Sequence, residues 1–395
     1  MSMNAWQVLD VGSIWMKEFA SALAEMEPVV AWLPKIENAG AFLTWERTRR
    51  SENPPLEMRE FPLQRGYARF PIRSFVPYET GMIKRMVAQT QSPEQSPLIC
   101  STPFYAPVAE RWPGPIIYYV TDLTAAYDGL NADQVRALDV RMCKAARVVC
   151  PNSRRIAKYL IEKAECEGHK ITVVPNATRE SNVADRPREE PGPLPTDVID
   201  LTRPIVGVLG DLSGNMDWEL IAEVVQRTQE LSWLFVGPAD RQIADAQQRG
   251  AREWVKANAR FVGMKPYGEL QQYARCVDAA VLPYRKKEPT YSGSSTRFYE
   301  HLAAGRPMVA TRGFAELLEK EPLLALADNA EEMIHALRKL RAAGFRDGHE
   351  AARWEASKKG TWQERARAMR HALLLSDSQS ASASEYRGPE PVRLS

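Results

Sequence analysis

Short runs of apolar residues alternate along the chain with segments in which apolar residues recur at helical spacing. The first run covers residues 6–12 (WQVLDVG), and helical spacing follows at once over residues 14–26. Similar runs follow at residues 97–103, 115–122, 147–153 and 170–176. A helix over residues 131–146 is expected between the second and third of these, with Asn131 as its N-cap. This alternation predicts a parallel sheet with helices on both faces.

The same rhythm repeats in the second half of the chain, after a proline-rich stretch. Residues 184–204 hold five prolines among charged residues, so we expect a linker at 185–203. Beyond it, apolar runs recur at residues 204–212, 231–238, 260–264, 278–284 and 307–313, with helical segments at 217–228 and 269–277. The sequence thus predicts an α/β fold of two doubly wound Rossmann-like domains, over residues 1–184 and 204–360. The polar, Ser-rich residues 376–395 are expected to form a disordered tail.

The composition is that of an ordinary globular protein. Of the 395 residues, 44% are hydrophobic and 26% are charged, and the net charge of +2 argues against a dedicated nucleic-acid binder. The five cysteines are scattered without metal-ligand spacing, which favours buried thiols in a reducing compartment. The chain shows neither a signal-peptide pattern nor an apolar stretch of about 18 residues. We therefore expect a cytoplasmic enzyme.

One stretch of the second half carries most of the candidate chemistry: YSGSSTRFYEHLAAGRPMVATRG, residues 291–313. A loop of glycine and hydroxyl residues leads into a short helix, and this loop follows an apolar strand of the predicted sheet. Ligands of open parallel sheets bind at this edge, and the first N–H groups of a helix form an anion site. The expected phosphate-binding residues are Gly293, Ser294, Ser295, Thr296 and Arg297, the last adding a bidentate cation.

Glu300 lies three residues after Arg297 and therefore on the same helix face. A carboxylate there can accept two hydrogen bonds from a sugar diol, so phosphate donors followed by a diol acceptor suit a nucleoside diphosphate. A simpler interpretation gives structural roles to the same residues. In that case SGSS caps the helix, Arg297 and Glu300 form a surface ion pair, and AAGRP ends the helix. The residues of this stretch alone leave both interpretations open.

The segment S-x-S-S-x-R-F-Y-E-x-L-A-A-G-x-P-x-V-A-T resembles the donor-site signature of GT-B glycosyltransferases, particularly bacterial ones that build cell-surface polysaccharides. Weaker matches surround it in order: VVPNA at 173–177, VGVLGDLSGNMDWELI, LFVGP and FVGMKPYGELQQYARCVDAAVLPY. TWQERARAM at 361–369 is similar to the final helix of that fold, which crosses back onto the first domain. The resemblance covers residues 97–370 and implies a GT-B fold in which a helix at 361–375 joins the first domain.

The resemblance also implies a division of labour between the domains. The second domain would hold a nucleotide-sugar donor, UDP- or GDP-linked, and the first a glycan or lipid-linked acceptor. Glu300 would bind the ribose and residues 294–297 the diphosphate. The other implied donor-site residues are Gly210, Asp211, Pro238, Lys265, Tyr284 and Ser292, with Gly12 and Ser13 reaching the phosphates from the first domain. Each of these positions also suits an ordinary turn residue.

One part of the signature departs from the family pattern. Retaining members commonly carry two glutamates separated by seven residues; the second matches Glu300, but the first falls on Ser292, with Glu288 nearby and out of register. The basic pair that many retaining members carry after the second domain's first strand is absent from GDLSGNMDW. Both departures weaken a retaining assignment and leave diphosphate neutralisation to Arg297, helped by the basic run at 285–287.

An inverting transfer needs a general base on the first domain, across the cleft from the donor. Asp122 ends the apolar run PIIYYVTD, at the carboxyl end of a predicted strand. In similar inverting GT-B enzymes an Asp on this loop is the base, so Asp122 is the predicted base and Asp128 the second choice. The structural alternative for Asp122 is an Asx turn or a helix N-cap. The sequence has no D-x-D run, so we expect transfer without a metal ion.

Residues 44–75 mix seven arginines with aromatic side chains. That mixture suits peripheral contact with the inner face of an anionic membrane, where a lipid-linked acceptor would be received. The alternative, which we favour, is that this stretch is a solvated, loop-rich segment beside the acceptor.

Four other classes compete with a glycosyltransferase. An NAD(P)-dependent oxidoreductase and a P-loop NTPase are disfavoured, because neither G-x-G-x-x-G nor G-x-x-x-x-G-K-[ST] follows an opening strand. A sugar-nucleotide epimerase of the same two-domain frame stays open. So does a binding module that keeps the nucleotide pocket without turnover.

Overall fold

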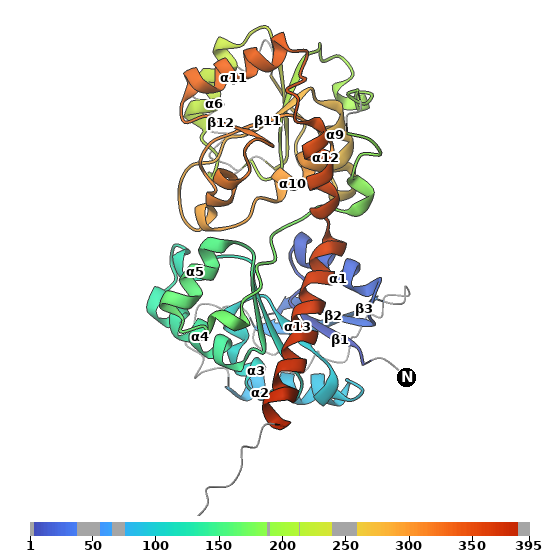
Figure 1. Ribbon diagram of the computed structural model, residues 1–395, viewed down its shortest axis with the longest axis vertical. Helices are drawn as coiled ribbons and strands as arrows, with labels where there is room; N and C mark the ends of the chain where they lie inside the picture. The colour runs from blue at the N-terminus through green and yellow to red at the C-terminus, as the bar shows by residue number, and fades with distance from the viewer. Residues whose placement is uncertain are drawn as a thin grey trace, which may run out of the picture.

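The computed structural model describes residues 4–37, 56–64, 76–187, 190–212, 214–238 and 259–385. It has two lobes, each built on a six-stranded parallel sheet (Figure 1). The first sheet has the order β3-β2-β1-β4-β5-β6 and the second the order β12-β11-β10-β7-β8-β9. The strands of the first are Trp6–Leu9 (β1), Val29–Glu37 (β2), Leu56–Gln64 (β3), Leu98–Cys100 (β4), Ile116–Val120 (β5) and Val148–Pro151 (β6). Those of the second are Ile205–Leu209 (β7), Ser232–Val236 (β8), Ala259–Phe261 (β9), Ala279–Leu282 (β10), Met308–Ala310 (β11) and Ala325–Leu326 (β12).

Helices connect the strands and cover the sheets. The described helices of the first lobe are Ile14–Ala24 (α1), Val76–Ala88 (α2), Ala106–Ala109 (α3), Ala132–Ala145 (α4) and Arg154–Lys163 (α5). Those that follow are Trp218–Arg227 (α6), Leu270–Cys276 (α9), Thr296–Ala303 (α10), Ala330–Ala342 (α11), Glu350–Lys359 (α12) and Trp362–Glu385 (α13). Two parallel sheets are therefore present, with helices connecting their strands, which confirms the prediction of a doubly wound α/β fold.

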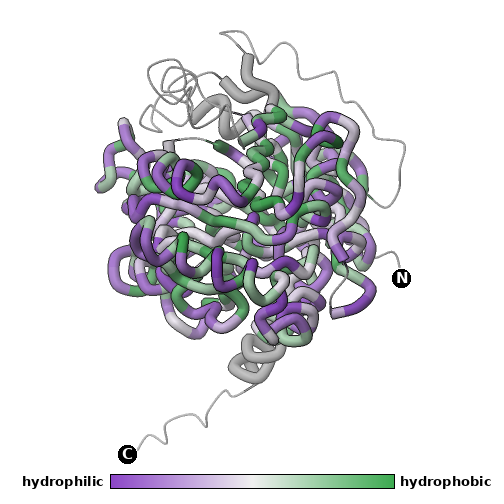
Figure 2. The backbone as a smooth tube through the Cα atoms, turned by 90° about the horizontal axis from the view of Figure 1, so that it is seen from above, coloured by the Kyte–Doolittle hydropathy of each residue, from purple (hydrophilic) through white to green (hydrophobic). Residues whose placement is uncertain are grey.

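Both faces of the first sheet are buried, as a parallel sheet with crossover helices requires. On β5, Ile117 and Tyr119 face one apolar cluster, and Tyr118 and Val120 face the other. Side chains alternate between the faces of a strand, so one continuous apolar run supplies two cores. Figure 2 shows hydrophilic segments around the outside of the molecule.

The last helix returns to the first lobe. In Figure 1, α13 continues from the end of α12 in the second lobe and runs along the first. Its apolar side chains Trp362, Ala366, Met369 and Leu373 are buried in the cluster that α1 also covers. Their spacing of three or four residues places them on one helix face. The crossing helix implied by TWQERARAM is therefore confirmed.

Several sequence predictions match and others need correction. Asn131 caps α4, because its Oδ1 accepts from the N–H of Gln134 at 3.0 Å. The run at 170–176 is not a regular strand: it makes one bridge, between Val149 and Ile171, and its N–H groups at 172 and 174 donate to β6, whereas the N–H of Asn176 donates to Ser294 Oγ at 3.0 Å instead. α13 also continues through Glu385, over the first part of the predicted tail, while residues 386–395 lie outside the described residues.

The chain passes between the lobes at two places that lie side by side. The N–H of Thr178 donates to Gly360 O at 3.0 Å, and the N–H of Trp362 donates to Thr178 O at 2.9 Å. The proline-rich stretch lies against the second lobe, where the N–H of Gly192 donates to Arg275 O at 2.9 Å. The passage therefore precedes the predicted linker at 185–203. The division of the chain at residues 184, 204 and 360 stays our proposal.

Two further expectations concern the whole chain. All five cysteines are buried and free. No helix among the described residues is long and apolar enough to cross a membrane. Residues 44–55 and 65–75 of the arginine-rich stretch lie outside the described residues.

Candidate active site

A cleft of about 570 Å³ lies between the two lobes, at the carboxyl ends of strands from both sheets. Its first-lobe wall includes Trp15, Asp122 and Tyr127, from α1 and the loop after β5. The second lobe contributes the loops after β7 and β10 and the start of α10. This is the edge at which doubly wound folds bind their ligands.

Most of the predicted site residues meet in this cleft. Those that line it are Asp122, Asp128, Gly210, Asp211, Tyr284, Gly293, Ser294, Ser295, Thr296, Arg297 and Glu300. Residues from loops more than a hundred positions apart are thus brought to one cavity.

Five predicted donor-site residues, Gly12, Ser13, Pro238, Lys265 and Ser292, are not among those that line the cleft, and Ser13 caps α1 by accepting from Met16 N at 3.4 Å. Lys265 forms an ion pair with Asp197 at 2.6 Å, and Ser292 is buried. Pro238 uses its carbonyl to accept from Leu212 N at 3.1 Å, and Gly12 lies against Asp10. The ammonium group of Lys265 is thus paired with a carboxylate of the same lobe.

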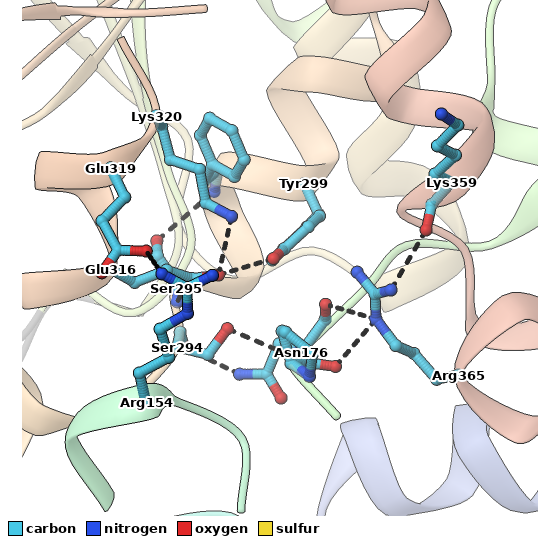
Figure 3. A network of polar contacts seen from close by, with 12 residues as sticks. Arg154, Asn176, Ser294, Ser295, Tyr299, Glu316, Glu319, Lys320, Lys359 and Arg365 are labelled. Carbon is cyan, nitrogen blue, oxygen red and sulfur yellow. Dashed lines mark hydrogen bonds and ion pairs between the residues drawn. The ribbon is translucent and has the colours of Figure 1, made fainter. Parts of the chain in front are cut away.

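The beginning of α10 is partly occupied by the chain itself (Figure 3). The N–H of Ser295 donates to Glu316 Oε2 at 3.0 Å, and the hydroxyl of Tyr299 donates to Glu316 Oε1. Helix N-termini favour such a carboxylate, because their free N–H groups carry partial positive charge. Ser295 therefore does not offer its N–H to a ligand here, which corrects the sequence prediction. The next N–H groups, at Thr296 and Arg297, belong to the first turn and precede the intrahelical bonds.

The guanidinium of Arg297 lies against the backbone of Gly210. One of its nitrogens donates to the Tyr284 hydroxyl and another to Asp211 O at 2.7 Å, while its Nε is buried without a hydrogen bond. A Cβ at Gly210 would lie 1.9 Å from that Nε, and Gly210 has φ +105°, so both space and backbone require glycine. A guanidinium has five N–H donors, so Arg297 retains capacity for an anionic ligand.

Glu300 is more enclosed than its sequence position suggests. Its Oε1 accepts from the Tyr267 hydroxyl, and its Oε2 accepts from Thr178 Oγ1 at 2.9 Å and Asn182 Nδ2 at 3.2 Å. Burial raises the pKa of Glu300, and these hydrogen bonds act in the opposite direction. A carboxylate offers about four acceptor positions. The three bonds therefore leave room for one donor, where a sugar diol was expected to use two.

The departure at Ser292 is answered by Glu288. Its carboxylate accepts from Ser292 Oγ at 2.8 Å and from Ser292 N at 3.1 Å. Arg155 of α5 donates to Ser292 Oγ at 2.9 Å and forms an ion pair with Glu288 at 3.3 Å. Glu288 itself lines the cleft. The Glu288 carboxylate thus contacts Ser292, the position where the family pattern has its first glutamate. Its ion pair with Arg155 also joins this loop to the first lobe.

Backbone contacts also join the lobes beneath the cleft (Figure 3). Asn176 donates from its N–H to Ser294 Oγ at 3.0 Å and from Nδ2 to Ser294 O at 2.7 Å. The hydroxyl of Ser153 donates to Ser292 O. The loop before α10 is therefore held by Ser153 and Asn176 of the first lobe, and its residues 293–295 line the cleft.

Asp122 lies across the cleft in the first lobe. Burial raises its pKa to about 6, against the lowering effect of a hydrogen bond from Tyr127. A carboxyl that titrates near neutral pH is suited to general acid–base chemistry. The second choice, Asp128, has a side chain that is 94% exposed and pairs with Lys287 at 3.5 Å. The geometry therefore favours Asp122.

Sequence reasoning missed four residues that shape the site: Trp15, Asn176, Tyr267 and Glu316. Asn176 and Tyr267 lie in segments that resemble the family, VVPNA and FVGMKPY, but the resemblance gave them no role, and Trp15 and Glu316 lie in no such segment. Each acts through a partner more than twenty positions away or through a wall of the cleft. No group of three or more His, Cys, Asp or Glu side chains that could hold a metal ion is found in the described part of the chain.

Comparison with known proteins agrees with this architecture. Residues 203–342 match the family model described as glycosyl transferases group 1. A Bacillus subtilis (strain 168) protein whose name assigns it to teichuronic acid biosynthesis, the glycosyltransferase TuaH, is 25% identical over 108 residues. That match covers 27% of this chain and 26% of TuaH, about a quarter of either.

Solved structures match nearly the whole chain at low identity. HepE of Anabaena, in complex with UDP-glucose, has a TM-score of 0.64 and 14% identity, and the match covers 96% of this chain and all of HepE. Sucrose-phosphate synthase of Thermosynechococcus elongatus has a TM-score of 0.63 and 14% identity, covering 97% and 99%. Trehalose 6-phosphate synthase of Burkholderia multivorans has a TM-score of 0.64 and 15% identity, covering 99% and 100%. The chain thus has the GT-B fold, and residues 203–342 match the group 1 glycosyl transferase family.

Proposed function

We propose that the chain transfers a sugar from a uridine diphosphate sugar to a hydroxyl group of an acceptor. The single observation that carries the proposal is the cleft, which joins Arg297 and the α10 N-terminus of one lobe to Asp122 of the other. HepE, which shares the fold, was solved with UDP-glucose, and this favours UDP over GDP.

In the proposed reaction Asp122 takes the proton of the acceptor hydroxyl as its oxygen bonds to the anomeric carbon. The bond from that carbon to the diphosphate oxygen breaks, and the electron pair leaves with the diphosphate. Arg297 and the N–H groups at Thr296 and Arg297 stabilise that negative charge. The base and the groups that stabilise the departing diphosphate belong to opposite lobes, so we propose that the acceptor oxygen attacks from the face opposite the diphosphate and inverts the anomeric configuration.

The remaining site residues take supporting roles in this proposal. Gly210, Asp211 and Tyr284 hold the Arg297 guanidinium in place, and Ser294 fixes the loop through Asn176. Glu300 accepts one ribose hydroxyl. Charge neutralisation by Arg297 replaces a metal ion, so addition of a chelator is expected to leave the rate unchanged.

The biological setting is also a proposal. Likeness to TuaH over part of the second domain supports assembly of a bacterial cell-envelope polysaccharide, on a glycan or lipid-linked acceptor. The enzyme would then work in the cytoplasm at the inner face of the membrane, with no nucleic-acid partner.

Transfer of a radiolabelled sugar from UDP-glucose and related donors tests the proposal, with Asp122→Asn beside the wild type. We expect the variant to lose about 10²–10⁴ in rate while keeping its affinity for UDP, because the base is removed and the donor site is not. Asp128→Asn is the matched control and should stay within a few-fold of the wild type.

The alternatives predict different outcomes of the same assay. An epimerase would interconvert the donor sugar without releasing UDP. A binding module would be stabilised by UDP and release nothing. Full activity of Asp122→Asn would remove the proposed base, and absence of any nucleotide-dependent rise in melting temperature would remove the proposed donor site.

A further inference from the structure

A second, smaller pocket opens beside the cleft on the first lobe. It has a volume of about 320 Å³ and lies at the carboxyl ends of β1, β4 and β5. Trp15, Thr121, Asp122 and Tyr127 line both cavities. The proposed base therefore stands where the two spaces meet, and a molecule in the smaller pocket can reach it with a hydroxyl group.

The charged residues among the described lining of this pocket are all acidic. Its polar lining consists of two carboxyl groups, Asp10 and Asp122, and the hydroxyl groups of Ser13, Ser101, Thr102, Thr121 and Thr124. None of the described residues that line it is a lysine or an arginine. Carboxylates accept hydrogen bonds from sugar hydroxyls, and the hydroxyl groups of serine and threonine both donate to them and accept from them. Neither group offers a phosphate a compensating positive charge.

Aromatic side chains flank the opening. Trp15 is 36% exposed and Tyr127 is 42% exposed, both high for large apolar side chains. Exposed aromatic rings beside convergent polar groups are typical of ligand sites. Rings of this kind can cover the apolar C–H face of a pyranose while the polar groups bind its edge.

Asp10 is held so that its carboxylate stays in the pocket. Its backbone has φ 65°, and its carboxyl oxygens accept from the Tyr105 hydroxyl at 3.1 Å and from Gly12 N at 3.4 Å. Burial raises the pKa of Asp10, and the two hydrogen bonds counteract that effect. A left-handed backbone conformation is costly for most residues, though less so for Asp and Asn. This position thus maintains a strained backbone and an acidic side chain together.

We propose that this pocket holds the acceptor, and that the sugar unit it receives is unphosphorylated and neutral or amino-substituted. The inference rests on the proposed glycosyl transfer and names the acceptor class for it. A phosphate placed here would face Asp10 and Asp122 in a partly desolvated space, where like charges repel strongly. Selection of the acceptor then comes largely from rejection of anions, with hydrogen bonds and ring stacking positioning the accepted sugar.

The test compares matched acceptors by release of UDP from the UDP-sugar that proves active. The probes are glucose, mannose and glucosamine, each beside its 6-phosphate. At least one unphosphorylated sugar should raise UDP release above the acceptor-free rate, and its 6-phosphate should be at least tenfold poorer in kcat/KM. Equal or better use of the phosphorylated sugars would overturn the proposal, and so would a failure of all six probes to stimulate release.

Two variants check that the pocket causes the discrimination. Asp10→Asn keeps a residue that tolerates φ 65° and removes the charge, so the preference for the unphosphorylated sugar should fall at least threefold. Thr102→Arg adds a cation to the lining and should improve use of the 6-phosphate relative to the neutral sugar. Glu25→Gln, at a carboxylate outside the pocket, is the control and should leave the ratio unchanged. An unchanged ratio in both pocket variants would contradict the proposal.

These outcomes separate from failure of the proposed function itself. Acceptor-free hydrolysis of the donor and stabilisation of the fold by UDP depend on the cleft alone. If neither occurs, the glycosyltransferase proposal fails. If both occur and the phosphorylated acceptors are preferred, only the acceptor class is wrong.

Discussion

The two walls of the cleft are built on opposite principles. The second-lobe wall presents the first N–H groups of α10 and two cations, Arg297 and Lys287. Its carboxylates are Asp211, Glu288, which pairs with Arg155, and Glu300, which accepts three hydrogen bonds from the chain. Hydrogen bonds from Asn176 to Ser294 join this wall to the first lobe. The first-lobe wall presents carboxyl groups beside exposed aromatic rings, Trp15 and Tyr127. One wall suits an anion and the other repels one.

This difference explains how one cavity can keep two substrates apart. A nucleotide diphosphate is favoured where positive partial charges converge and disfavoured beside Asp10 and Asp122. An uncharged sugar has no net charge for Arg297 to attract, and its hydroxyl groups can donate hydrogen bonds to the carboxyl groups. In the proposed reaction, charge would assign each substrate to its own wall, and the new bond would form where the walls meet.

Within the second-lobe wall, the largest expected effect comes from removing the cation Arg297. Arg297→Ala should lower kcat/KM by about 10²–10³, because a charge that stabilises the leaving diphosphate is lost. Steady-state kinetics with varied donor would measure it. Arg312→Ala, at an exposed arginine paired with Asp328 at 2.7 Å, is the control and should have little effect. A similar loss in both variants would show that the effect is not specific to the donor wall.

A smaller effect is expected from filling the space that Arg297 occupies. Gly210→Ala places a Cβ 1.9 Å from the Arg297 Nε at a backbone φ of +105°, so the guanidinium must move. We expect kcat/KM to fall by roughly 10- to 100-fold, with some loss of melting temperature. Gly214→Ala in the same loop, where a Cβ would meet nothing within 4 Å, is the matched control. Equal tolerance of both substitutions would contradict the described geometry.

The first-lobe wall of the cleft should make the reaction rate depend on pH. The pKa of Asp122 is raised to about 6, and a general base acts in its ionised form, so kcat/KM should fall about tenfold per unit as pH drops below 6. The same shift disfavours the ionised group in the folded state, so its contribution to stability is present at low pH and is lost as pH rises through 6. A pH–rate profile checks the first statement, and thermal melts of the wild type and Asp122→Asn check the second. A rate that stays flat from pH 7 to pH 5 would exclude Asp122 as the base.

The donor wall was largely predictable because its chemistry is local. The order of strand, hydroxyl-rich loop and helix is contiguous in the sequence, so it fixed the N-terminus of α10 and placed Arg297 on it. The capping pattern at Asn131 and the return of the last helix were predictable for the same reason. Apolar runs of β4 to β6 were visible because both faces of those strands are buried.

What remained hidden depends on long-range contacts. Neither β2 nor β3 was predicted. These two strands lie at one side of the first sheet, and their sequences contain charged residues and prolines that are not typical of a buried strand. The occupation of the Ser295 N–H by Glu316 joins residues 21 positions apart. The enclosure of Glu300 joins it to Thr178, 122 positions away. A single sequence gives no measure of such pairings, so it did not indicate that the chain itself donates three hydrogen bonds to Glu300.

A crystal structure of the chain with UDP bound would test the central claim most directly. We predict the diphosphate within hydrogen-bond distance of the Arg297 guanidinium and the first N–H groups of α10, with its outer phosphate directed across the cleft toward Asp122. A diphosphate bound elsewhere, with Arg297 still turned to Tyr284 and Asp211 alone, would contradict the account.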